Sequence, residues 1–115
     1  MSLSPSMMAK LDGLRDRFEE VSALLADPEV MADRDRFTAL SREFAELEPV
    51  IQSFDAVRDM DTELEESRAL AESDDDPEMR ALAEEDVARL SDSLASEQTR
   101  LKALLLPRDP NDASN

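Results

Sequence analysis

Residues 37–57 read FTALSREFAELEPVIQSFDAV, and this stretch decides the fold. Its apolar side chains recur every three or four residues, the period of one helix face: Phe37, Leu40, Phe44, Leu47, Ile51, Phe54 and Val57. Pro49 interrupts the stretch and allows either a kink within one helix or a break between two. The apolar pattern keeps its phase across Pro49, and no Gly or Asn nearby could reverse the chain. We therefore expect one kinked helix over residues 33–72, with Asp33 as its N-cap.

A first helix is predicted before this stretch, over residues 5–26. Its apolar residues have the same helical spacing: Met7, Leu11, Leu14, Phe18, Val21 and Leu25. Ser4 or Ser6 can cap it. Because a residue before proline is pushed out of the helical region, the helix should end near Asp27. Residues 27–32 are then expected to be a short connection.

A third helix is predicted over residues 77–106. Asp76 can cap it, and Pro77 suits the first helical position. Its stripe is Met79, Ala83, Val87, Leu90, Leu94, Glu97, Leu101 and Leu104. Glu97 interrupts the apolar face as either a solvated edge or a register-setting polar contact. We favour the solvated edge.

Short connections make neighbouring helices antiparallel. The expected fold class is therefore all-α: an antiparallel three-helix bundle that resembles a coiled coil, with a long kinked second helix. At about 1.5 Å per residue, the second and third helices should project past the first as a hairpin. Exposed apolar residues near Met60, Leu64 and Met79 would then favour a dimer of the isolated domain or a partner surface.

The domain boundaries follow from the same pattern. The helical domain is expected over residues 7–106, and residues 1–6 are interpreted as a leader outside the fold. Residues 107–115 read PRDPNDASN, which is polar and turn-forming. They are expected to begin a linker to missing downstream domains, so the chain is interpreted as a fragment of a longer protein.

Composition excludes several classes of function. The chain has 29 acidic and 13 basic residues, a net charge of -16, and phosphate backbones repel such a protein. We therefore expect no direct nucleic-acid grip. There is no Cys and no His, so thiolate chemistry, zinc sites and the usual general base are missing. No apolar run is long enough to span a membrane, and a soluble cytoplasmic protein is expected.

No catalytic, cofactor-binding or metal-binding residue is predicted. The run Asp74-Asp75-Asp76 lacks the alternating ligands, central Gly and distal Glu of a calcium loop, and is interpreted as a helix-capping turn. Acid–base catalysis needs carboxylates held in an enclosed site. The paired carboxylates are instead interpreted as charged outer faces: Glu19-Glu20, Glu65-Glu66 and Glu84-Glu85. The residues alone predict a non-enzymatic, acidic helical module for protein–protein contact.

Four stretches resemble the N-terminal domain of the bacterial class I peptide chain release factors, most closely the release factor one type that reads UAA and UAG. They are residues 11–25, 35–47, 75–80 followed by 83–85, and 104–112. The last, LLLPRDPND, is the most specific, although Arg108 stands where the family usually has Lys. The resemblance implies a role in translation termination and contact with the protein at the base of the ribosomal stalk. It also implies an influence on cooperation with the GTPase that recycles the factor.

The parts of the family that perform termination are absent from these residues. The Gly-Gly-Gln hydrolysis motif needs adjacent glycines, and the chain has only Gly13. The Pro-x-Thr codon-reading motif is absent too, so no catalytic or codon-reading residue carries over. The alternative hypothesis is a free-standing acidic coiled-coil adaptor or chaperone-like module that self-associates.

Overall fold

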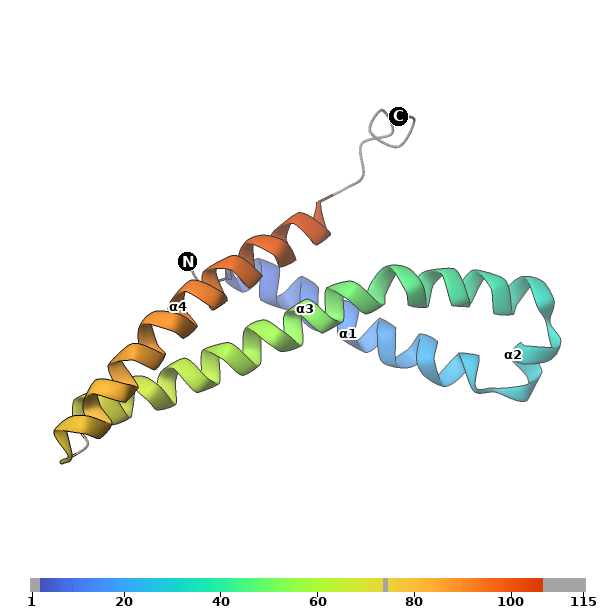
Figure 1. Cartoon of the computed structure of the whole chain (residues 1–115). Coiled ribbons are helices and arrows are strands. Elements are labelled where there is room, and N and C mark those ends of the chain that lie inside the picture. Colours follow the sequence, from blue (N-terminus) through green and yellow to red (C-terminus); the bar gives the residue numbers. More distant parts are fainter. Residues whose placement is uncertain (1–2, 74, 107–115) are drawn as a thin grey trace.

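A computed structural model of the chain describes residues 3–73 and 75–106. Within these residues the regular structure is helical: α1 (Pro5–Leu25), α2 (Pro28–Ala32), α3 (Arg34–Ser73) and α4 (Pro77–Leu105). Figure 1 shows that α3 lies antiparallel to both α1 and α4 and extends along the molecule from one end to the other. The predicted all-α fold is confirmed, and the bounds of the three long helices differ from the predicted ones by at most one residue.

Side chains just before each long helix satisfy backbone donors of its first turn, which have no partner within the helix. The capping hydrogen bonds run from Met7 N–H to Ser4 Oγ (3.2 Å), from Arg36 N–H to Asp33 Oδ1 (3.2 Å) and from Glu78 N–H to Asp76 Oδ1 (3.0 Å). Ser4 rather than Ser6 therefore caps α1. The predicted caps at Asp33 and Asp76 are confirmed.

The expectation of a plain connection over residues 27–32 is wrong, because the short helix α2 forms there. The Asp27 carboxylate accepts a hydrogen bond from the Glu29 N–H at 2.9 Å. The order Asp27-Pro28-Glu29 repeats that of Asp76-Pro77-Glu78, so the same start signal was present in the sequence. The fully buried Val30 then holds α2 in a small apolar cluster with α1 and α3.

The interpretation of residues 1–6 as a leader outside the fold needs correction. Ser4 caps α1, Pro5 begins it, and Leu3 packs against the main apolar core. Residues 3–6 are therefore part of the folded domain. Residues 1 and 2, and the predicted linker over residues 107–115, lie outside the described residues.

Helix α3 continues through Pro49 without a break, so the prediction of one helix is confirmed. Proline removes one backbone hydrogen bond and its ring crowds the preceding turn, which bends a helix. Figure 1 shows α3 changing direction near its middle. The half before Pro49 packs with α1 and α2, and the half after it packs with α4 and the N-terminal part of α1.

The buried apolar side chains form two clusters that share α3. The larger contains Leu11, Val50, Phe54, Val57, Leu64, Leu90, Leu94 and Leu101, and the smaller contains Val21, Val30 and Leu40. No Cα atom of α1 lies within 8 Å of one in α4 among the described residues. The two long helices α1 and α4 are therefore joined mainly through α3, in a layout more open than a compact bundle.

Three predicted core residues are instead exposed, namely Phe37, Met79 and Leu104. Each lies in the first or last turn of its helix. Exposed apolar residues were also expected near Met60, Leu64 and Met79: Met79 and the nearby Leu70 are exposed, whereas Leu64 is buried and Met60 is partly buried.

Replacing Phe54 by Ala should strongly destabilise the domain, since Phe54 is fully buried at 0% exposure where side chains of α1, α3 and α4 meet. We expect a loss of about 3–5 kcal/mol in the free energy of unfolding. The matched control is Phe37→Ala at a 38% exposed position, for which we expect about 1 kcal/mol or less. Urea unfolding followed by circular dichroism measures both. Similar losses for the two variants would contradict this core assignment.

Candidate protein-interaction surface

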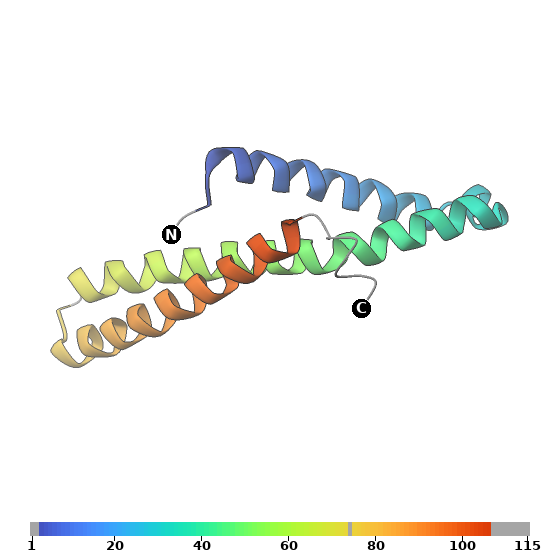
Figure 2. The ribbon, with the colours of Figure 1, turned by 90° about the horizontal axis from the view of Figure 1, so that it is seen from above.

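Apolar side chains are exposed at both ends of the molecule. At the closed end of the α3–α4 hairpin they are Leu70, Met79 and Leu82, which we call the hairpin end. At the opposite end they are Met31 of α2 and Phe37 of α3, which we call the α2 end. Figure 2 shows the hairpin extending past the N-terminal end of α1, so the hairpin end is free of other helices.

The hairpin is also the most acidic part of the chain. Residues 57–98 contain 15 acidic and four basic residues. The carboxylate pairs that the sequence placed on outer faces are exposed in the structure, as predicted, at residues 19–20, 65–66 and 84–85. An acidic surface that also exposes apolar side chains is suited to a basic protein partner.

Two arginines pack on Phe54 at the junction of the helices. The guanidinium carbons of Arg15 and Arg58 each lie 5.4 Å from the Phe54 ring centroid, within the range of a cation–π contact. Arg15 of α1 also forms an ion pair with Asp55 of α3. These cations are engaged inside the domain, and the sequence pattern did not indicate that they would meet at one aromatic ring.

A second ion pair holds α1 to the first half of α3. The Arg17 guanidinium donates to both carboxylate oxygens of Glu43, at 2.5 and 2.6 Å, and to Glu20 at 2.6 Å. The two-pronged hydrogen bond raises the pKa of Arg17 and lowers the pKa of Glu43. Beside it, the Phe18 and Phe44 rings stack at a centroid distance of 4.8 Å.

Glu97 does not lie at a solvated edge, which corrects the favoured interpretation of the sequence. Its side chain is 17% exposed and accepts a hydrogen bond from the buried Ser53 hydroxyl at 2.6 Å. The register-setting alternative therefore describes it better, because this partly buried hydrogen bond forms only when α3 and α4 are correctly aligned.

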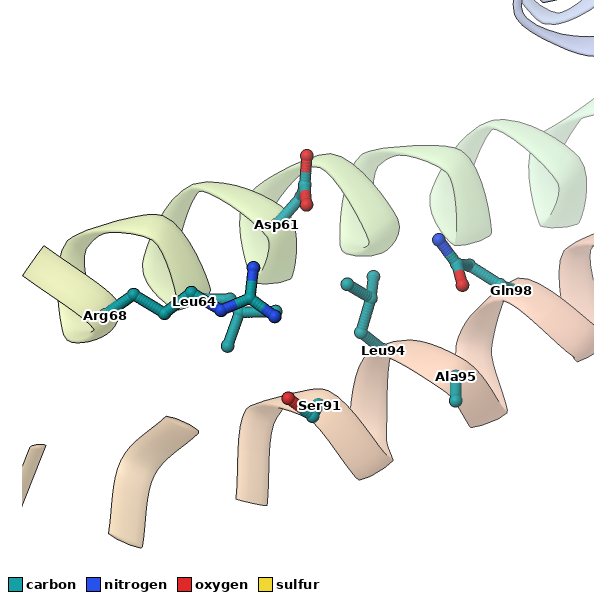
Figure 3. Close-up of a pocket in the computed structure, with 7 residues that line it drawn as sticks. All are labelled: Asp61, Leu64, Arg68, Ser91, Leu94, Ala95 and Gln98. Atoms are coloured by element: carbon teal, nitrogen blue, oxygen red, sulfur yellow. The ribbon is translucent and has the colours of Figure 1, made fainter. Parts of the chain in front are cut away.

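A groove of about 220 Å³ lies between α3 and α4 in the hairpin. Figure 3 shows the residues that line it: Asp61, Leu64, Arg68, Ser91, Leu94, Ala95 and Gln98. Leu64 and Leu94 are buried and form its floor. The sequence analysis missed this α3–α4 groove, although the alanines at 81, 88 and 95 recur at a helical spacing of seven.

The described residues provide no arrangement for metal chemistry: they contain no group of three or more Asp or Glu side chains positioned to hold an ion. Asp76 caps α4, and Asp74 lies outside the described residues. None of the helices over residues 3–73 and 75–106 combines the length and apolar character needed to cross a bilayer.

Comparison with protein families identifies most of the chain. The family model for the PCRF domain matches residues 14–115. The match begins within α1 and includes the whole of α2, α3 and α4.

The Arg17–Glu43 ion pair should contribute to stability in a pH-dependent way. Because the folded-state pKa of Glu43 lies below its ordinary value of 4.5, the contribution is complete above that pH and is lost as the pH falls through the folded pKa. Glu43→Gln should therefore lower the Tm at about pH 7, and its difference from wild type should shrink toward about pH 2–3. The control Glu46→Gln, at an exposed position on the same helix, should leave the Tm near wild type. A difference for Glu43→Gln that persists at low pH would contradict an ion-pair origin.

Proposed function

The chain belongs to the PCRF-domain family of peptide chain release factors, and from this premise we propose that its helical domain contacts the ribosome through protein rather than RNA. A domain of this family acts in translation termination in association with the ribosome. The observation that carries the proposal is the family match over residues 14–115. The site of action would then be the cytoplasm, where ribosomes translate.

The charge distribution supports a protein partner. A net charge of -16 repels rRNA phosphates at long range. Arg15, Arg17 and Arg58 contact carboxylates or the Phe54 ring within the domain, so they do not form a free basic patch. The partner that the resemblance implies, the protein at the base of the ribosomal stalk, fits this surface if it presents basic side chains. Contact there would also place the domain where it can influence the GTPase that recycles the factor.

We assign this contact to the hairpin end. Leu70, Met79 and Leu82 expose apolar surface at the tip of a projecting arm, among acidic side chains. Apolar anchors with a charged rim are typical of protein interfaces. Self-association of the isolated domain would use the same side chains only where salt screens the repulsion between two acidic copies. Sedimentation at low and high salt distinguishes a monomer from such a dimer.

The codon type is a finer part of the proposal. The segment LLLPRDPND at residues 104–112 resembles the type that reads UAA and UAG, and this resemblance supports that type. The natural gene provides the check, because the full-length product should release peptide at UAA and UAG codons but not at UGA. Release at UGA in place of UAG would assign the chain to the other type.

Residues 1–115 alone should neither hydrolyse peptidyl-tRNA nor select a stop codon. The chain has one glycine, so it cannot contain the Gly-Gly-Gln motif, and it has no Pro-x-Thr sequence. On ribosomes with peptidyl-tRNA and a stop codon in the decoding site, peptide release should equal the no-factor control. Stop-dependent release above that background would show that the domain is itself catalytic.

Ribosome binding should depend on the hairpin end more than on the α2 end. Leu82 and Met31 are matched in exposure, at 55% and 56%. We expect Leu82→Asp to weaken binding by about tenfold, because a charge replaces an apolar anchor. Met31→Asp should leave it within about twofold. Co-sedimentation with ribosomes measures both, and ribosomes depleted of the stalk-base protein are the specificity control. If Met31→Asp alone weakens binding, the contact lies at the α2 end instead.

A further inference from the structure

The α3–α4 groove adjoins the place where the N-terminal part of α1 packs on the hairpin. A second hollow, of about 250 Å³, lies between the N-terminal part of α1 and the hairpin, with Leu3 and Met8 among its lining residues. It shares Asp61 and Gln98 with the groove. Figure 2 shows α1 over one face of the α3–α4 layer, with its N-terminal end short of the hairpin's closed end. Beyond the N-terminal end of α1, no helix of the described residues covers this face of α3 and α4.

Gln98 gives this groove a polar group that has no hydrogen-bond partner among the described residues. Its side chain is only 8% exposed, and over residues 3–73 and 75–106 its amide forms no hydrogen bond. The amide reaches from α4 toward α3 in Figure 3. The polar atoms of Gln98 remain accessible from the groove. Among the described residues, the one side-chain polar atom that is both fully enclosed and unpaired is Nε of Arg15. A group that enters the groove can therefore replace solvent at this amide with a direct hydrogen bond.

The α4 side of the groove is lined by small side chains. Ser91 and Ala95 line it directly, and the exposed Ala88 lies one turn before Ser91 on the same side of α4. The distance between two packed helices depends on the side chains at their contact. Small residues here allow the backbone of another helix to come close to α4.

The charged residues on the α3 side of the groove indicate what kind of helix could bind there. Asp61, Glu65, Arg68 and Glu72 are spaced four, three and four residues apart, so they share one side of α3. A guanidinium nitrogen of Arg68 lies 3.8 Å from a carboxylate oxygen of Glu65. This ion pair partly neutralises Arg68, the only cation of the four. The rim is therefore acidic and attracts a basic segment, whereas a second copy of this chain is repelled.

We propose that the α3–α4 groove binds an amphipathic helix from a basic partner protein. Apolar side chains of that helix pack over Leu64 and Leu94 beside Ala95. A polar side chain satisfies the Gln98 amide, and flanking Lys or Arg side chains pair with Asp61 and Glu65. The bound helix continues the row that α1 occupies and completes a third layer on the hairpin. The residues that line the groove differ from Leu70, Met79 and Leu82 of the hairpin end, so variants of the two sites test the two proposals separately.

The test uses residues 1–115 and two amphipathic helical peptides of about 18 residues with the same leucine stripe, one flanked by Lys and one by Glu. Calorimetry at moderate salt should detect the Lys peptide and not the Glu peptide. Ala95→Arg fills the groove and should weaken binding by at least about tenfold. Ala23→Arg adds the same charge to an exposed position on α1, and it should change binding by about twofold or less.

Gln98→Met separates recognition from folding. Because the amide forms no hydrogen bond within residues 3–73 and 75–106, its removal should leave the Tm unchanged or higher and weaken Lys-peptide binding by about fivefold. Several outcomes would overturn the proposal: no binding of the Lys peptide, equal losses for Ala95→Arg and Ala23→Arg, or unchanged binding with a lower Tm for Gln98→Met. A salt-independent dimer that Ala95→Arg abolishes would overturn it too, because the groove would then hold a second copy.

Discussion

The continuity of α3 through Pro49 is the constraint on which the other helices depend. Both core clusters include side chains of α3, and α1 and α4 have no close backbone contact with each other. A break at Pro49 would leave α1 as the one long helix that contacts both halves of α3 among the described residues. Phe54, five residues beyond the proline, joins the halves because α1 and α4 both supply apolar neighbours to its cluster. Helix formation across a proline is unfavourable alone, so packing on both sides must maintain it.

The internal use of arginine explains how so acidic a chain can fold and still present an acidic exterior. Arg15 and Arg17 of α1 pair with Asp55 and Glu43 of α3, on either side of Pro49. These cations offset carboxylates at the helix contacts, where like charges would oppose packing. The hairpin, with its few basic residues, keeps most of the negative charge. The same distribution favours basic protein partners over nucleic acid.

Two neighbouring residues of α4, Glu97 and Gln98, have different roles at the contact between α3 and α4. Glu97 bonds Ser53 and is satisfied within the domain, which aligns α3 with α4. Gln98, the next residue, is as well buried as Leu94 but has no hydrogen-bond partner in the part of the chain that the structure describes. Successive residues of a helix point about 100° apart, so Glu97 contacts Ser53 while Gln98 lines the groove. One polar group thus fixes the hairpin, and the other is available to a ligand.

The sequence by itself determined where the helices lie, because helix formation depends on residues close along the chain. The caps at Ser4 or Ser6, Asp33 and Asp76 and the three- and four-residue apolar spacing predicted the long helices to within one residue. The helix start at Asp27-Pro28-Glu29 was equally local and was overlooked. The absence of a Gly-Gly-Gln motif and of a Pro-x-Thr motif from residues 1–115 is likewise evident from the sequence alone.

Only the tertiary structure decided which side chains are covered. Phe37 and Met79 have the spacing of core residues but lie exposed in the end turns of their helices. Glu97 interrupts an apolar stripe, and only its contact with the distant Ser53 shows that it is part of the packing. The groove at Gln98 depends on where α1 ends relative to the hairpin. Helical periodicity identifies a face of each helix, whereas burial depends on the lengths and placement of helices far apart in the chain.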